Sequence, residues 1–446
     1  MTLGVVKLMR PTATPRTEKA ARTNTTVSAP SPSAILPMRT LVPRERASTH
    51  KRSLSFSTLR TSTRNPFMFH RAYGAGDPMV SSQSLAKSIV KGSLRPKPDE
   101  VVLISTYPHT IELAEATALE CQKAGADPAL WLDTDALFYG NFKNYSVESL
   151  HRVSGHCVGL LDYVNSYVWL NGPRNPAPMA TVPREKFAAM FEGEKAHFDK
   201  MFAKVPKNVS LAIGQVTRER AKTYGLNYPK WKAMVEAATV VNTERLASLG
   251  NLVAGLVSRP VDVRVTADNG TKLKFRLAGP ERKPYVHDGV ISDEDLAVGT
   301  LASRSVDLPT GEVGIAPVEE SASGTFVADV PIPQRGRLVE GLSWTFRNGK
   351  VTDFSAKKNL PFAQTNWAEA TGSKDVFGEV SFGLNSKALP GFMQNSIVAG
   401  TVSISIGDNR GAGGKNDSSY GFSAPLAHGT VEIGGKTVIQ DGTWTI

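Results

Sequence analysis

The chain has 446 residues, of which 41% are hydrophobic, and it carries 52 Lys or Arg against 41 Asp or Glu. The basic excess is confined to residues 1–78, where 13 basic residues face three acidic ones; the rest of the chain has a net charge of +1. The pI near 9.5 is therefore a property of this segment and argues against a nucleic-acid-binding face. No apolar run approaches ~18 residues, which argues against a membrane span.

Residues 1–78 also contain 20 Ser or Thr and have no sustained apolar periodicity, so we expect a disordered tail. Two interpretations stay open. The Arg-rich, acid-poor composition is typical of an organellar transit peptide, but Met79 also precedes a credible first helix and could be the true start. The chain has only two cysteines, Cys121 and Cys157, which is typical of a reducing compartment. We expect a cytoplasmic protein, or an organelle-matrix protein if the tail is a transit peptide.

Residues 79–260 alternate predicted strands and helices. We expect strands over 101–104, 128–132 and 158–161, and helices over 111–124, 184–204 and 228–256. This pattern predicts an α/β domain with a parallel sheet. No G-x-G-x-x-G follows the first strand, so a dinucleotide site is not supported. His109 follows that strand directly, where open α/β sheets present ligand-contacting residues, although a local hydrogen bond is the more common role for a loop histidine.

The period of the sequence changes near Pro260. Residues 261–266 alternate polar and apolar side chains, a turn over 268–270 follows, and 272–277 alternate again, which predicts a hairpin. Turns at 347–350 and 433–436 predict two more. Residues 261–446 are therefore expected to form a β-rich, α+β domain, and the predicted domains are 1–78, 79–260 and 261–446.

Two short glutamate motifs lie in this second half: Leu308–Val313 (LPTGEV) and Phe377–Val380 (FGEV). In each, a glutamate follows a glycine and precedes a valine, so it stands where a turn leads into a strand. Two carboxylates brought together in this way could hold a hard divalent cation. For either motif alone, a solvated residue at a strand end is the more common explanation.

Together with Thr345–Phe354 and Gly400–Asn409, the two motifs occur in an order that resembles the thermophilic-type metallo-aminopeptidase family, which includes bacterial aminopeptidases T and S. The resemblance covers about residues 80–446. It implies a dimeric exopeptidase with two metal ions held by two Glu, two His and one Asp. By motif, the two glutamates correspond to Glu312 and Glu379, the expected catalytic and metal-binding residues.

The other three family ligands carry over poorly. Ser403 stands where the first His belongs. In the preferred register His428 takes the place of the second His and Thr430 that of the Asp. Asp408 could add an oxygen ligand. After residue 260 the chain contains only His287 and His428. The resemblance therefore implies an altered site for Zn, Co, Mn or Mg, or a site that has lost its metal.

These observations favour a metal-dependent aminopeptidase-type hydrolase that acts on a peptide or small-molecule substrate. A second hypothesis is a relative of the iron-dependent 2,5-dihydroxypyridine ring-cleaving dioxygenases, in which a serine stands at one metal position. A third is a metal-free scaffold or binding protein. The pair His156-Cys157 lacks partners at ligand spacing, so we interpret it as structural.

Overall fold

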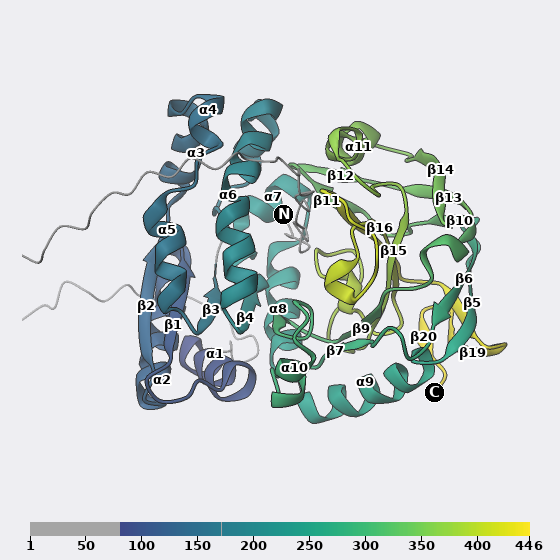
Figure 1. Cartoon of the computed structure of the whole chain (residues 1–446), viewed down its shortest axis with the longest axis horizontal. Coiled ribbons are helices and arrows are strands. Elements are labelled where there is room, and N and C mark those ends of the chain that lie inside the picture. The colour runs from purple at the N-terminus through teal and green to yellow at the C-terminus, as the bar shows by residue number, and fades with distance from the viewer. Residues whose placement is uncertain (1–80, 171) are drawn as a thin grey trace, which may run out of the picture. The chain divides into compact units, whose positions relative to one another are not determined.

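The structure is a computed structural model that describes residues 81–170 and 172–446. Its first sheet consists of five parallel strands (Figure 1). The strands lie in the order β2 (Asp127–Leu132), β1 (Val101–Thr106), β3 (Ser166–Trp169), β4 (Lys207–Leu211) and β8 (Ser305–Leu308). All four pairings are parallel, since the intervening helices return the chain to the same end of the sheet. The predicted α/β half is confirmed. The expected disordered tail lies outside the described residues.

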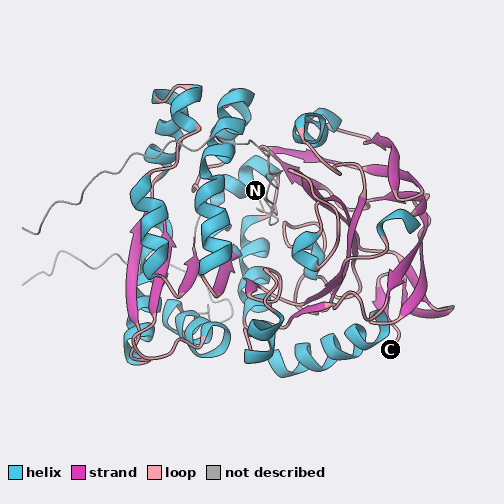
Figure 2. Cartoon of the chain, viewed as in Figure 1, coloured by secondary structure: helices cyan, strands magenta, loops and turns pink. Residues whose placement is uncertain are grey.

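Helices occupy most of the remaining sequence before residue 260 (Figure 2). They are α1 (Ser82–Ser88), α2 (Ile111–Lys123), α3 (Asp135–Asn144), α4 (Val147–Leu150), α5 (Gly155–Leu160), α6 (Arg184–Lys204), α7 (Arg218–Tyr224), α8 (Tyr228–Thr239) and α9 (Thr243–Val257). Later in the chain follow α10 (Asp293–Val298) and α11 (Leu360–Glu369). None of these helices, among the residues described, is long and apolar enough to cross a membrane.

Two local predictions in this half are wrong. Residues 158–161 are helical rather than extended, because a four-residue apolar run fits a short helix as well as a strand; the strand is β3, a few residues later. The expected single helix over 228–256 is two helices. The side chain of Asn242 accepts a hydrogen bond from the Arg245 N–H at 2.8 Å, which caps the start of α9 and separates it from α8.

The β-rich half contains two larger antiparallel sheets and one small one. The eight-stranded sheet has the order β14 (Lys350–Ser355), β13 (Ser343–Arg347), β10 (Ser323–Val327), β6 (Lys272–Ala278), β5 (Pro260–Thr266), β18 (Thr430–Ile433), β19 (Lys436–Gln440) and β20 (Thr443–Trp444). The five-stranded sheet, which we call the site sheet, has the order β17 (Gly421–Leu426), β16 (Val402–Gly407), β15 (Phe377–Gly383), β9 (Glu312–Ile315) and β7 (Tyr285–His287). β11 (Ile332–Gln334) pairs with β12 (Arg337–Val339). The three predicted hairpins are confirmed as β5–β6, β13–β14 and β18–β19.

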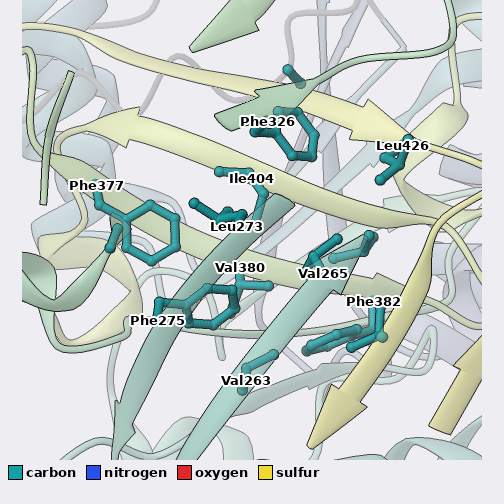
Figure 3. Close-up of a cluster of buried hydrophobic side chains, with 14 of the residues drawn as sticks. Val263, Val265, Leu273, Phe275, Phe326, Phe377, Val380, Phe382, Ile404 and Leu426 are labelled. Atoms are coloured by element: carbon teal, nitrogen blue, oxygen red, sulfur yellow. The ribbon is translucent and has the colours of Figure 1, made fainter. Parts of the chain in front are cut away.

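One large hydrophobic core joins the two antiparallel sheets (Figure 3). The eight-stranded sheet contributes Val263, Val265, Leu273 and Phe275, and the site sheet contributes Phe377, Val380, Phe382, Ile404 and Leu426. The rings of Phe275 and Phe377 lie 5.1 Å apart across this layer. Because alternate side chains of a strand point to opposite faces, the residues between these apolar positions must lie on the other face of the site sheet.

β8 connects the two halves of the fold. It lies after the expected domain boundary near residue 260, yet it pairs with β4 as the edge strand of the parallel sheet. Only residues 309–311 then separate it from β9 of the site sheet. The carboxyl end of a parallel sheet, where α/β proteins commonly bind ligands, is thus joined directly to Glu312, the first residue of β9.

Candidate active site

The face of the site sheet that points away from the hydrophobic core is polar. On β9, Val313 and Ile315 enter the core, so Glu312 and Gly314 point the other way. Directly opposed residues of neighbouring strands share a face. The resulting cross-strand rows are His287, Glu312 and Gly383, followed by Tyr285, Gly314, Ser381 and Ser403.

Tyr285 connects this face to the second glutamate. Its hydroxyl Oη donates a hydrogen bond to Glu379 Oε1. The ring passes over Gly314, where an added Cβ would collide with the phenol. Burial, together with the charges of Glu379 and Glu312, raises the pKa of Tyr285 well above its ordinary value near 10. Tyr285 therefore keeps its proton at neutral pH and acts as a hydrogen-bond donor that orients Glu379.

His287 makes the corresponding contact with the first glutamate. Its Nδ1 lies 3.4 Å from Glu312 Oε1, and the two side chains are 13% and 16% exposed. Its Nε2 lies 2.9 Å from the carbonyl oxygen of Ala302. Burial lowers the pKa of His287, but the hydrogen bond and negative charge of Glu312 outweigh burial, so the pKa is raised overall. Glu312, His287, Tyr285 and Glu379 therefore form one connected polar chain, in which the Tyr285 and His287 rings lie 4.5 Å apart.

Asp307 and Asn385 border this chain. Asp307 lies on β8, receives a hydrogen bond from Ser210, and has its pKa raised by burial and by the charge of Glu312. Asn385 is fully buried. Its Nδ2 donates to the carbonyls of Ala238 at 2.9 Å and Thr310 at 2.6 Å. Asn385 thereby ties the turn before Glu312 to the end of α8 and fixes the position of that glutamate.

The structure brings only some of the predicted site residues together. Glu312, Glu379 and Ser403 lie on the polar face described above. Ser403 is 2% exposed, and its buried hydroxyl has no hydrogen-bond partner within the described part of the chain. An orphaned buried hydroxyl of this kind would be satisfied by a water or by a polar group of a ligand.

The other three predicted residues make different contacts. Asp408 is paired with Arg410, whose Nη2 lies 2.8 Å away. His428 is a turn residue whose side chain is 65% exposed, and its Nδ1 lies 2.8 Å from Asp329 Oδ2. Thr430 pairs with Thr266 in the eight-stranded sheet, and its hydroxyl accepts a bond from the Asp441 N–H. None of these contacts is with Glu312 or Glu379.

These positions do not fit a two-ion centre of the kind the family resemblance implied. Thr430 and Ser403 lack the strong donors that a zinc ion needs, and His428 is engaged by Asp329. Across residues 81–170 and 172–446, no three His, Cys, Asp or Glu side chains already converge as a metal cluster would. The donors that do meet are Glu312 and His287, a carboxylate and an imidazole, and they pair with each other at 3.4 Å.

His109, at the carboxyl end of β1, has a local hydrogen-bonding role. Its Nε2 lies 2.8 Å from the carbonyl oxygen of Gly214, the loop after β4. Burial lowers the pKa of His109, so the imidazole is neutral at pH 7 and donates to this carbonyl. The contact joins two loops at the carboxyl edge of the parallel sheet.

Residues 262–397 match the sequence model of the thermophilic metalloprotease family, M29. The resemblance to the thermophilic metalloproteases is confirmed. The matched range contains Glu312 and Glu379, together with Tyr285, His287 and Asp307, and it ends before Ser403, Asp408, His428 and Thr430. The metalloprotease signature is therefore retained around the two glutamates and is not matched where the remaining ligands were expected.

Two solved structures share the fold. Wild-type AmpT from Thermus thermophilus aligns with a TM-score of 0.65 at 15% identity, over 82% of this chain and 99% of that chain. The 2,5-dihydroxypyridine dioxygenase from Pseudomonas putida KT2440 aligns with a TM-score of 0.51 at 13% identity, over 82% and 96%. No curated protein matches the sequence. At these identities the structures establish the architecture alone.

Tyr285, His287 and Asp307 were not predicted as site residues. β7 has only three residues, too few for an alternating pattern to indicate a strand. The available signal was the spacing of two ring side chains, Tyr285 and His287, two positions apart and just before the Asp288-Gly289 turn. That spacing places both rings on one face only if the segment is extended.

Proposed function

We propose that the chain is a metal-dependent peptidase that removes residues from the amino terminus of peptides at the polar face of the site sheet, using one ion rather than two. The observation that carries this proposal is the placement of Glu312 and Glu379, the two carboxylates of the metalloprotease motifs. They lie on one face and are linked through Tyr285 and His287. Only three residues separate this face from the carboxyl end of β8 in the parallel sheet.

Each residue of the polar chain has a distinct role in this proposal. A divalent ion held here would supply Lewis acidity, which polarises a carbonyl and makes a water molecule more acidic. Glu312 is the carboxylate that would hold this ion, with the imidazole of His287 beside it. Glu379, oriented by the Tyr285 hydroxyl, is placed to accept a proton from the attacking water or to pair with the peptide's α-ammonium. The orphaned Ser403 hydroxyl is available to a substrate group or a water.

The test is hydrolysis of aminoacyl-anilides by the full chain, with Mg, Mn, Co and Zn added separately after chelator treatment. Glu312→Gln and Glu379→Gln remove the charge and preserve the shape, and each should lower turnover by at least about 100-fold, the usual contribution of a catalytic carboxylate. Glu320→Gln is the matched control, because Glu320 is exposed and close in sequence to the first motif.

The proposal fails if the wild-type chain shows no metal-dependent turnover, or if both variants match it. Oxygen uptake with a dihydroxypyridine, measured on the same preparations, tests for a ring-cleaving activity like that of the dioxygenase whose structure shares the fold. Oxygen consumption without anilide hydrolysis would favour an oxygenase and would also contradict the proposed peptidase function.

A further inference from the structure

We propose that Asn409 and Asn416 are positioning residues for Glu379: their side-chain amides hold a β-bulge in β15, and this bulge turns the Glu379 carboxylate towards Tyr285. The inference deepens the proposed function and rests on it for the role of Glu379 as a catalytic carboxylate. Both asparagines lie beyond residues 262–397, the range that matches the metalloprotease family.

A β-bulge interrupts the alternation of β15 at Glu379. Gly378 and Glu379 together oppose a single residue of β16, Ser405. Phe377 and Val380, on either side of this pair, both enter the hydrophobic core. In a regular strand Phe377 and Glu379, two residues apart, would share a face. The extra residue of the bulge therefore lets Phe377 stay in the core while Glu379 points to the polar face.

Two asparagine amides bind the carbonyl groups of the bulge. Asn409 Nδ2 donates to the carbonyl oxygen of Gly378 at 2.7 Å. Asn416 Nδ2 donates to the carbonyl oxygen of Phe377 at 2.9 Å and to that of Gly407 in β16 at 3.0 Å, so it bridges both strands. Asn409 is fully buried and Asn416 is 6% exposed. Because buried carbonyls need a donor and a bulge disrupts the regular ladder, this pair, which we call the bulge clamp, stabilises the bulged conformation.

The amide of Asn409 is itself held in one orientation. Its Nδ2 lies between two acceptors, the Gly378 carbonyl and Glu319 Oε1 at 3.0 Å. Its Oδ1 accepts a hydrogen bond from the Asn416 N–H at 2.8 Å. A flipped amide would lose all three bonds. Gly414 leaves the space that this side chain fills, since an added Cβ would lie 2.0 Å from Asn409 Cγ. The loop after β16 is therefore built around the bulge clamp.

Amide hydrogen exchange of the full chain, followed by mass spectrometry, tests the bulge clamp directly. In Asn416→Ala, peptides that contain residues 377–383 should exchange about tenfold faster than in wild type, because the bulge loses a buried donor. Asn208→Ala is the matched control, because Asn208 is also a buried asparagine but lies in β4 of the parallel sheet. It should leave the exchange of residues 377–383 as in wild type.

Two double-mutant cycles test whether the bulge clamp acts through Glu379. In urea unfolding, Tyr285→Phe should destabilise wild type more than it destabilises Asn416→Ala, because the Tyr285–Glu379 hydrogen bond is already weakened in that variant. In anilide hydrolysis, Asn416→Ala should lower kcat by about 10–100-fold, as expected for a misplaced catalytic group, and should add almost nothing to Glu379→Gln. A clamp with only a structural role would give additive effects in both cycles.

Gly414→Ala guards against a folding defect in the asparagine variants, since it leaves both amides in the chain and displaces that of Asn409; circular dichroism and melting temperature are recorded for each variant. A folded Gly414→Ala or Asn416→Ala with wild-type exchange over residues 377–383 overturns the proposal, and so does an additive stability cycle. Faster exchange and a coupled stability cycle without any anilide hydrolysis leave this inference standing and remove the proposed function. Metal-dependent hydrolysis that is unaffected by Asn416→Ala does the reverse.

Discussion

The phenol ring of Tyr285 lies over Gly314, its cross-strand partner in the site sheet. Any side chain at position 314 would occupy the space of this ring. The glycine two residues after Glu312 therefore has a steric function: it allows a tyrosine from β7 to cross β9 and reach Glu379 on β15. One backbone position thus controls the link between the two glutamates.

Gly314→Ala should displace Tyr285 and break its hydrogen bond with Glu379. Overpacking at a buried position typically costs about 1–3 kcal/mol of unfolding free energy, and we expect a loss in this range by urea denaturation. Gly255→Ala is the control, because Gly255 is an exposed position in α9 with open space around its Cα; it should raise stability by about 0.4–1 kcal/mol. Equal stability of Gly314→Ala and wild type would show that the ring does not lie where the structure places it.

Asn385→Asp tests the buried amide that supports the turn before Glu312. The substitution preserves shape but replaces an NH₂ donor, shared by the carbonyls of Ala238 and Thr310, with an oxygen that faces both. Leaving buried acceptors without a donor costs about 1–3 kcal/mol for each group, so for these two carbonyls we expect the unfolding free energy to fall by about 2–6 kcal/mol. If peptidase activity is present, it should fall more than in Asn269→Asp, an exposed-turn control. An unchanged unfolding free energy would contradict the assigned role.

Local sequence signals were sufficient for much of the fold and for half of the polar chain. The hairpin at Asp268-Asn269-Gly270 and the glycine-preceded Glu312 and Glu379 are short-range patterns, in which turn chemistry and strand alternation lie within a few residues. The element order was predictable for the same reason, because βαβ alternation and paired hairpins are each encoded over short stretches.

The remaining features depend on pairings that no local pattern specifies. β8 joins β4 across nearly a hundred residues. β7 is defined as a strand only by its pairing with β9, so Tyr285 and His287 became visible as neighbours of the glutamates only in three dimensions. His428 stands at the expected place in the sequence, but its turn is anchored by Asp329, a residue from a distant loop.

The two cysteines should react slowly under native conditions. Burial raises the pKa of Cys121 to about 12 and also raises the pKa of Cys157, so both remain thiols at pH 7, and the thiolate is the reactive form. His156 Nε2 lies 3.4 Å from Cys157 Sγ, yet it does not offset burial. Thiol titration with a disulfide reagent should label Cys157 slowly, at a rate that increases with pH, and Cys121 only after unfolding in urea. Rapid labelling of Cys157 at pH 7 would instead indicate a thiolate stabilised by His156.

Glu319 and Arg282 form a buried ion pair that is connected through Asn409 to the backbone just before Glu379. Arg282 donates from Nη1 and Nη2 to the two carboxylate oxygens at 2.7 and 2.8 Å. Asn409 Nδ2 also donates to Glu319, and it bonds the carbonyl of Gly378, the residue before Glu379. Removing one partner of a buried pair typically costs about 3–5 kcal/mol. We expect that loss for Glu319→Gln at pH 7, with Glu320→Gln as the exposed control.

The same pair predicts how stability depends on pH. Burial alone would raise the pKa of Glu319, but the hydrogen bonds from Arg282, the Lys415 N–H and Asn409 outweigh it and lower the pKa in the folded state. A folded-state pKa below that of the unfolded chain, about 4.3, contributes stability that is present above the unfolded value and is lost as pH falls through the folded one. The difference in unfolding free energy between wild type and Glu319→Gln should therefore be largest near pH 7 and shrink below about pH 4. Urea unfolding from pH 7 to pH 3 measures it, and a difference that stays constant over this range would show that Glu319 is not charged in the folded protein.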